Sequence, residues 1–204
     1  MTEKIVSYLD ELFPNPKCEL NYTKDYELLI AVMLSAQTTD KRVNEVTSVL
    51  FKKYPTIEAL AQAKQEDIID IIRPIVTFNI KSKNVIEIAK SLVHDTNGIV
   101  PNDRKYIESL SGVGHKTANV VLSNLYDEEC VAVDTHVSRV SIRLGIAKKS
   151  DDVLDIEKKI TKKFKGFSLK RLHHQLVLFG RYYCKAKNPN CENCKLKDMC
   201  KNYK

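Results

Sequence analysis

The chain has 204 residues, of which 43% are hydrophobic and 29% charged, a composition typical of a soluble globular protein with one large core or two small ones. Its net charge is +7, its first ten residues carry two acids and no apolar segment of the export-signal kind, and its longest apolar run is far too short to span a membrane. We therefore expect a cytoplasmic protein that does not associate with membranes.

Helical periodicity dominates the sequence, and no segment shows the apolar–polar alternation of a half-buried strand. The predicted helices are marked, in chain order, by Val43, Val46, Leu50 and Tyr54; Val85, Ala89, Leu92 and Val93; Val153, Ile156, Ile160 and Phe164, predicted as a buried stripe; and Leu169, Leu172, Leu176 and Phe179. Asp40, Ser150 and Ser168 are well placed to cap the first, third and fourth of these helices, and Gly98 to end the second. We therefore predict an all-α fold.

The segment from 104 to 123 is predicted to form two helices joined by the tight turn Gly112-Val113-Gly114. Such a turn presents backbone N–H groups at a helix N-terminus, where the helix dipole also favours an anion. A DNA phosphate would suit this site, and its contact would position the duplex without reading sequence. A plain helical hairpin, whose glycines only relieve strain, explains the glycines equally well.

Lys116 lies in the first turn of the second predicted helix, where the dipole disfavours a cation. With partial burial, this placement would lower the pKa of the lysine and raise the fraction of neutral amine. A neutral amine can attack a carbonyl-like carbon and form a Schiff base. The alternative is a surface lysine that binds phosphate as a simple charge.

Asp134 opens the segment Asp134-Thr135-His136 at the start of another predicted helix. An aspartate in this place is most often only an N-cap. Paired with Lys116 across a cleft, it would also supply the carboxylate that a glycosylase needs to stabilise positive charge on the sugar.

Four cysteines near the C-terminus follow the pattern C-x6-C-x2-C-x5-C, and four thiolates hold either a zinc ion or an iron–sulfur cluster. The spacing makes metal binding the expectation and leaves both metals open. Lys185 and Lys187 lie in a loop fixed at both ends by cysteines, which favours a phosphate clamp. The four cysteines are Cys184, Cys191, Cys194 and Cys200.

Positive charge is concentrated in the last quarter of the chain. Residues 158–204 contain 14 Lys and Arg against two acids, a balance of +12, whereas the rest of the chain has a balance of −5. This asymmetry fits a surface that binds a polyanion such as nucleic acid, and equally a solvated surface that aids solubility.

Several of these segments resemble the endonuclease III family. Leu110–Leu122 is similar to the helix-hairpin-helix of that family, and Val131–His136 to its catalytic aspartate motif. Glu27–Asp40 resembles its N-terminal signature, and the spacing of the four cysteines is that of its [4Fe-4S] cluster. The resemblance covers nearly the whole chain, with the motifs in the family's order.

The resemblance implies an all-α fold of two helical domains that flank a DNA-binding cleft. A six-helix barrel over 18–127 would contain the helix-hairpin-helix at about 104–123. Residues 1–17 and 128–204 would form the second domain and hold the [4Fe-4S] cluster. The partner would be duplex DNA with a damaged pyrimidine or an abasic site, bound by a monomer with the damaged base flipped out.

The resemblance also implies the chemistry. Lys116 would attack C1′ of the damaged nucleotide, and β-elimination from the resulting Schiff base would break the strand 3′ to the lesion. Asp134 would stabilise the sugar cation and help to activate the lysine, and the substrates would be oxidised or ring-saturated pyrimidines. Gln37 would fill the gap left by the flipped base. The remaining expected DNA contacts are Gly112, Val113, Gly114, His136, Lys185 and Lys187.

The chain departs from the family pattern at two places. Ser111 stands where proline is usual, which loosens the entry to the hairpin. Val76-Thr77-Phe78-Asn79 stands where we expect glycine, a bulky apolar residue and an aromatic. Thr77 is a poor intercalating wedge, so either Phe78 takes this role or the opposite strand is handled differently.

Two other functions compete with this interpretation. A monofunctional adenine-mismatch glycosylase shares the hairpin, the aspartate and the cluster, but does not have lysine at the position of Lys116. A non-catalytic DNA-binding module, stabilised by structural zinc, would bind DNA with steep salt dependence and cleave nothing.

Overall fold

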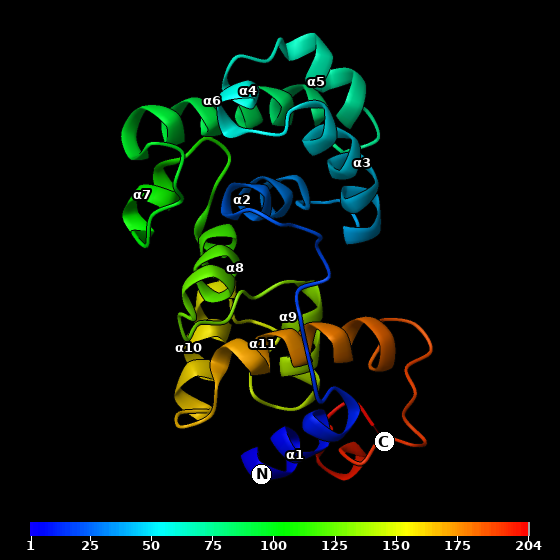
Figure 1. Cartoon of the computed structure of the whole chain (residues 1–204). Coiled ribbons are helices and arrows are strands. Elements are labelled where there is room, and N and C mark those ends of the chain that lie inside the picture. Colours follow the sequence, from blue (N-terminus) through cyan, green and yellow to red (C-terminus); the bar gives the residue numbers. More distant parts are fainter. Residues whose placement is uncertain (204) are drawn as a thin grey trace. The chain divides into compact units, whose positions relative to one another are not determined.

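The computed structural model describes residues 1–203 and divides them into two compact units. The middle unit is Glu19–Tyr126, and the terminal unit consists of Met1–Cys18 and the described residues from Asp127 onward (Figure 1). All regular elements among residues 1–203 are helical, which confirms the predicted all-α fold. Within the same residues, no helix has both the length and the apolar character needed to cross a membrane.

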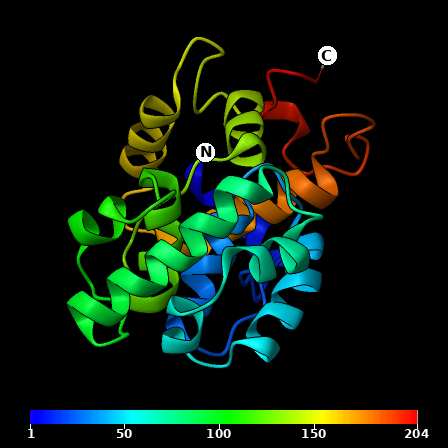
Figure 2. The same ribbon diagram turned by 90° about the horizontal axis from the view of Figure 1, so that it is seen from above.

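The middle unit is built around a helix that is buried on every side. All residues of α2 from Tyr26 to Leu34 are buried, as expected of a helix without a polar face. It contacts α3, α6 and α8 (Figure 1), and the long α6 packs along α4 and α5 (Figure 2). The helices of this unit are α2 (Asp25–Leu34), α3 (Asp40–Lys53), α4 (Ile57–Ala61), α5 (Gln65–Ile72), α6 (Phe78–Thr96), α7 (Arg104–Ser109) and α8 (His115–Tyr126).

The terminal unit brings the first helix of the chain against the last α-helix. Asp10 of α1 accepts hydrogen bonds from Arg171 Nε at 2.7 Å and Gln175 Nε2 at 2.8 Å, both from α11. Around them, Leu9, Val140 and Phe164 are among the buried residues of a continuous apolar core. The elements are α1 (Thr2–Leu12), α9 (Thr135–Arg143), α10 (Val153–Lys163), α11 (Leu169–Leu178), the π-helix η1 (Phe179–Tyr183) and the 3-10 helix η2 (Lys197–Met199).

Two of the three predicted N-caps are wrong. Thr39, not Asp40, caps α3, because its hydroxyl accepts from the backbone N–H of Arg42, and Asp40 lies in the first turn. Asp152, not Ser150, caps α10, with its carboxylate 2.8 Å from the backbone nitrogen of Asp155. In both cases a second capping residue lies one or two positions from the predicted one, and side-chain type alone does not choose between them.

The two remaining helix ends agree with the sequence. Ser168 caps α11 and accepts from the backbone N–H of Arg171. α6 ends at Thr96 and is followed by Asn97 and Gly98, both with positive φ, and Gly98 donates to the carbonyl of Leu92 at 2.7 Å. The backbone N–H of Asn97 donates to the same carbonyl, and the six-residue return bond from Gly98 commonly ends a helix at a left-handed residue.

The predicted buried face of α10 is wrong at one position. Because the helix begins at Val153, this residue lies in the first turn and is 49% exposed. Ile156, Ile160 and Phe164 are buried as predicted.

Candidate functional site

The middle unit contains the predicted helical hairpin, formed by α7 and α8. Gly112 has a φ of +74°, and a Cβ added there would lie 2.2 Å from Asn84 Nδ2 on α6. Val113 is buried and anchors the turn in the core, whereas Gly112 and Gly114 are exposed. A Cβ on Gly114 would meet nothing within 4 Å. The turn therefore needs a glycine at position 112 to adopt its backbone conformation. At position 114, the absence of a side chain leaves the start of α8 accessible.

Lys116 lies in the first turn of α8 and is exposed, so the predicted partial burial is wrong. The same end of the helix is ordered by hydrogen bonds. Arg104 Nη1 donates to Asn119 Oδ1 at 2.6 Å, and His115 Nδ1 lies 3.0 Å from Glu108 Oε1. Since the first N–H groups of a helix have no partner within it, this end of α8 can bind an anion beside an accessible amine.

Gln37 lies in the loop between α2 and α3, where it is exposed and has a φ of +58°. Thr77 has the same φ in the turn before α6 and is also exposed. Phe78 is half-buried, with the guanidinium of Arg73 5.9 Å from its ring centroid. Left-handed backbone is costly for residues other than glycine and often marks a functional loop.

Sequence reasoning missed two exposed apolar side chains beside Thr77. Val76 is 45% exposed and Ile80 is 65% exposed. Ile80 falls outside the apolar spacing of the buried face of α6, and this mismatch is the signal that could have found it.

In the terminal unit, Asp134 caps α9. Its Oδ1 accepts from the backbone N–H groups of His136 at 2.9 Å and Val137 at 2.8 Å. Both bonds end on the same oxygen, so the cap does not use Oδ2. The carboxylate is half-buried. It is therefore fixed in direction by the helix and keeps one oxygen for another partner.

The start of α9 packs directly against the π-helix η1. A Cβ added at Gly180 would lie 2.8 Å from Cβ of His136. Arg139 joins the same elements, because its Nη2 donates to the carbonyl of Gly180 at 2.6 Å and its Nε to the carbonyl of Cys184 at 3.2 Å. A glycine inside a helical pattern is the sequence signal for this close approach, and it went unused.

The four C-terminal cysteines line one pocket together with apolar side chains of the terminal unit, including Leu144, Phe179 and Leu196. Burial raises the pKa of the Cys194 thiol, and the other three cysteines of the motif raise it further. Four thiols that converge on an apolar pocket match the donor set of a [4Fe-4S] cluster. Within residues 1–203, no group of three or more His, Cys, Asp or Glu side chains is arranged for a single metal ion.

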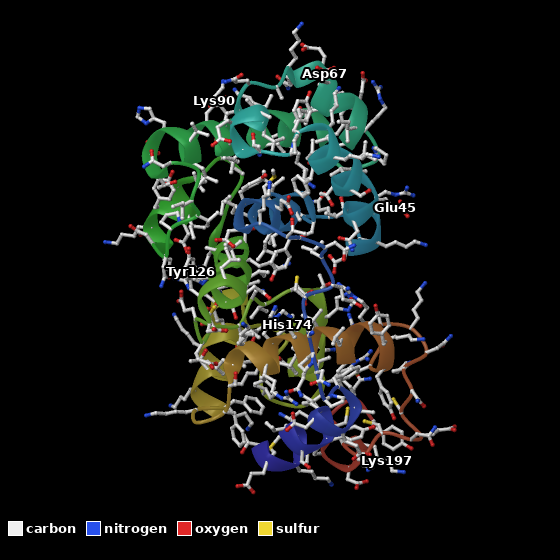
Figure 3. All side chains as sticks on the ribbon, in the orientation of Figure 1. Glu45, Asp67, Lys90, Tyr126, His174 and Lys197 are labelled. Carbon is white, nitrogen blue, oxygen red and sulfur yellow. The ribbon has the colours of Figure 1, made fainter. Side chains whose placement is uncertain are left out.

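Arg143 of α9 holds the loop that follows the first of these cysteines. Its Nη1 donates to Cys184 Sγ at 3.2 Å and to the carbonyl of Lys185 at 2.8 Å. Lys185 and Lys187 are exposed on this loop. Lys197, labelled in Figure 3, lies in η2 between the third and fourth cysteines.

Known proteins match both parts of this arrangement. The model of the HhH-GPD superfamily of base excision DNA repair proteins matches residues 30–166, more than half of the chain. The iron-sulfur binding domain of endonuclease III matches residues 184–200. Endonuclease III of Bacillus subtilis (strain 168) is 42% identical over 193 residues, which cover 95% of this chain and 88% of that protein. The chain belongs to the endonuclease III family.

Solved structures of the family have the same fold. A trapped covalent intermediate of endonuclease III with DNA, an estranged-adenine complex, matches with a TM-score of 0.93 and 41% identity over 98% of this chain and 96% of that one. A non-covalent complex of endonuclease III with DNA matches with a TM-score of 0.92 and 42% identity, over 98% of this chain and 95% of that one.

Membership of the family defines the activity. This member of the endonuclease III family is a base-excision repair enzyme, a DNA glycosylase and abasic-site lyase that acts on DNA. Residues 184–200, which include the four cysteines, match the family's iron-sulfur binding domain, so the cofactor is the [4Fe-4S] cluster and not the zinc ion that the spacing left open.

Proposed function

We propose that this glycosylase and lyase removes oxidised or ring-saturated pyrimidines from duplex DNA, with Lys116 as the nucleophile. The observation that carries the proposal is the accessible amine of Lys116 in the first turn of α8, directly after the Gly112–Gly114 turn. A phosphate held by that turn would keep the damaged nucleotide within reach of the lysine.

The proposed reaction begins when Lys116 Nζ, as the neutral amine, attacks C1′ of the damaged nucleotide. The bond from C1′ to the base breaks, and the base leaves with the bonding electrons and takes up a proton. The sugar ring opens to a Schiff base between C1′ and Nζ. Loss of a proton from C2′ then breaks the C3′–O bond, which cleaves the strand 3′ to the lesion. Water releases the lysine.

We propose that Asp134 stabilises the positive charge that develops on the sugar as the base leaves, and that it helps to activate the lysine. Its cap bonds to the backbone of α9 support this role, because they hold the carboxylate in one orientation before substrate arrives. An anion that is already oriented costs no reorganisation in the transition state.

The proposed DNA contacts come from both units. In the middle unit (we propose the helix-hairpin-helix domain, 18–127), Gln37 replaces the flipped base and the turn Gly112–Gly114 holds a phosphate. In the terminal unit (the proposed cluster domain, 1–17 and 128–204), the residues that contact the DNA backbone are His136, Lys185 and Lys187. The bound cluster would supply structural support by fixing the ends of the loop that contains both lysines.

Further parts of the proposal concern the opposite strand and the state of the protein. Thr77 and Phe78 stay alternatives for the intercalating wedge. Because Phe78 is half-buried beside Arg73, the exposed side chains of Val76 and Ile80 are further candidates.

We also propose that the enzyme is a cytoplasmic monomer.

The test of the substrate class compares two duplexes, one with thymine glycol and one with adenine opposite 8-oxoguanine. Wild type should release thymine glycol and cut that strand, and it should leave the adenine in place. Lys116→Ala should neither release thymine glycol nor cut the strand. Lys105→Ala, which changes an exposed lysine of α7, should keep both activities. Release of adenine without strand cleavage would overturn the proposal and favour a monofunctional mismatch glycosylase.

A further inference from the structure

Lys81 is a buried lysine of α6. It is 5% exposed, and burial lowers its pKa. Its Nζ donates to the carbonyl of Leu34 at 2.9 Å and to the carbonyl of Ala36 at 2.5 Å. Because a buried ammonium group is costly unless it is hydrogen-bonded, these two carbonyls are what keeps Lys81 in this position.

The two carbonyls belong to the C-terminal end of α2 and the loop that follows. The last carbonyls of a helix have no partner within the helix, and the dipole makes that end favourable for a cation. In the preceding turn, the hydroxyl of Ser35 provides a hydrogen-bond donor to the carbonyl of Val32, at 2.8 Å. Lys81 therefore continues the cap of α2 into the loop.

The loop that Lys81 holds contains Gln37. The carbonyl of Ala36, directly before Gln37, accepts from Lys81, and Thr38 N donates back to the carbonyl of Ser35 at 3.0 Å. Gln37 lies between these bonds with a φ of +58°. Since this backbone conformation is strained for a residue with a Cβ, the surrounding bonds must hold it.

The same lysine also closes the turn that contains Thr77. Its backbone N–H donates to the carbonyl of Thr77 at 3.0 Å, in the first turn of α6. Val76 N in turn donates to Thr38 Oγ1 at 3.4 Å, which joins the two loops directly. Lys81 thus contacts the loop of Gln37 through its side chain and the turn of Thr77 through its backbone.

We propose that Lys81 is a positioning residue for the flipping of the damaged nucleotide, because it locks the Gln37 loop and the Thr77 turn into one rigid pair. The inference rests on the proposed function, in which Gln37 takes the place of the flipped base. Lys81 does not touch the substrate. It acts by presenting Gln37 in a left-handed conformation that the loop alone would not keep.

The first test uses Lys81→Met, which keeps the length of the side chain and removes its charge and donors. Lys83→Met is the matched control, because Lys83 lies on the same helix and is exposed. The assay follows cleavage of a duplex that contains thymine glycol, and borohydride trapping on a single-stranded oligonucleotide with a preformed abasic site. The second substrate has neither a paired nor a stacked base to be flipped.

We expect Lys81→Met to lower kcat/KM on the duplex by about 10- to 100-fold, the effect of misplacing a substrate-positioning group. Trapping on the single strand should stay close to wild type, and Lys83→Met should match wild type on both. An equal loss on both substrates would mean that Lys81 only supports the fold, and no loss on either would mean that it has no role. Both outcomes overturn the proposal.

A double variant distinguishes an effect of Lys81 that acts through the position of Gln37 from an effect of Lys81 that is independent of Gln37. If Lys81 acts through Gln37, Lys81→Met in a Gln37→Ala background should cost little beyond Gln37→Ala alone, because coupled residues are not additive. Additive losses would contradict the proposal.

Hydrogen exchange tests the loop without any catalysis. The backbone N–H of Thr38 should lose protection in Lys81→Met and keep it in Lys83→Met. Unchanged protection would overturn the positioning role. If wild type neither cleaves the duplex nor is trapped on the single strand, the proposed function fails instead, and the exchange result still decides whether Lys81 holds the loop.

Discussion

Single residues of this enzyme combine a structural and a chemical task. Asp134 uses one carboxylate oxygen to cap α9, through the backbone N–H groups of His136 and Val137. The cap does not use the second oxygen, which we assign to the chemistry. The simple reading of this aspartate as an N-cap is therefore compatible with a catalytic one.

Asp134→Asn separates the two tasks, because asparagine caps helices about as well as aspartate but has no charge. We expect the melting temperature to stay near that of wild type and strand cleavage to fall by about 100-fold or more. Asp152→Asn, at the matching N-cap of α10, should change neither quantity. Full activity of Asp134→Asn would remove the carboxylate from the mechanism.

A second prediction for single residues concerns the effect of the two hairpin glycines on stability. Gly112→Ala adds a Cβ 2.2 Å from Asn84 Nδ2 at a positive φ, so we expect a loss of about 1–3 kcal/mol in unfolding free energy. Gly114→Ala meets nothing within 4 Å and should be as stable as wild type. Denaturant melts of the two variants measure the difference, and equal stability would contradict this view of the turn.

At the scale of elements, the cluster-binding segment is joined to the start of α9. η1 leads directly into Cys184, and Gly180 within it lies against His136. Arg139 and Arg143, one turn apart on α9, both donate to the carbonyl of Cys184. The helix that orients Asp134 therefore also holds Cys184, the first of the four cysteines proposed to bind the cluster.

Gly180→Ala should disturb this junction, because the new Cβ would lie 2.8 Å from Cβ and 3.2 Å from Cα of His136. We expect a loss of about 1–3 kcal/mol in stability, as for other overpacked sites, with lower activity and faster loss of the cluster's visible absorbance. Gly114→Ala is the control for the change in stability only, because its added Cβ meets nothing within 4 Å. Wild-type stability of Gly180→Ala would show that the two elements can separate freely.

Helix type and apolar faces could be predicted from the sequence, whereas the exact caps could not. Thr39 and Asp152 replaced the predicted Asp40 and Ser150, because neighbouring residues compete for the same backbone N–H groups. Val153 became exposed once α10 began at that residue. Contacts between distant segments, such as those of Lys81 and Gly180, depend on tertiary packing and have no local pattern that reveals a partner.

At the scale of the whole molecule, a buried histidine sets part of the pH dependence of stability. Burial, with a smaller effect of Lys170, lowers the pKa of His174 to about 4. In the unfolded chain a histidine takes up its proton near pH 6.5. Between these values only the unfolded chain is protonated, so stability falls as the pH drops from about 6.5 to about 4, by about 3 kcal/mol in all.

His174→Gln should remove this contribution. We expect wild type to lose more stability than His174→Gln between pH 7.5 and pH 5, as measured by thermal melts at both values. His94→Gln, at a histidine whose side chain is 88% exposed, should follow wild type. The histidine would have no such role if wild type and His174→Gln lost equal stability.

The central claim is that Lys116 forms a covalent Schiff base with damaged DNA. The most direct measurement is borohydride reduction of the cluster-loaded enzyme on a duplex with thymine glycol, followed by mass spectrometry of the trapped peptide. We predict one adduct, on Lys116, and none in Lys116→Ala. An adduct on another lysine, or none from wild type that binds the duplex, would contradict the account.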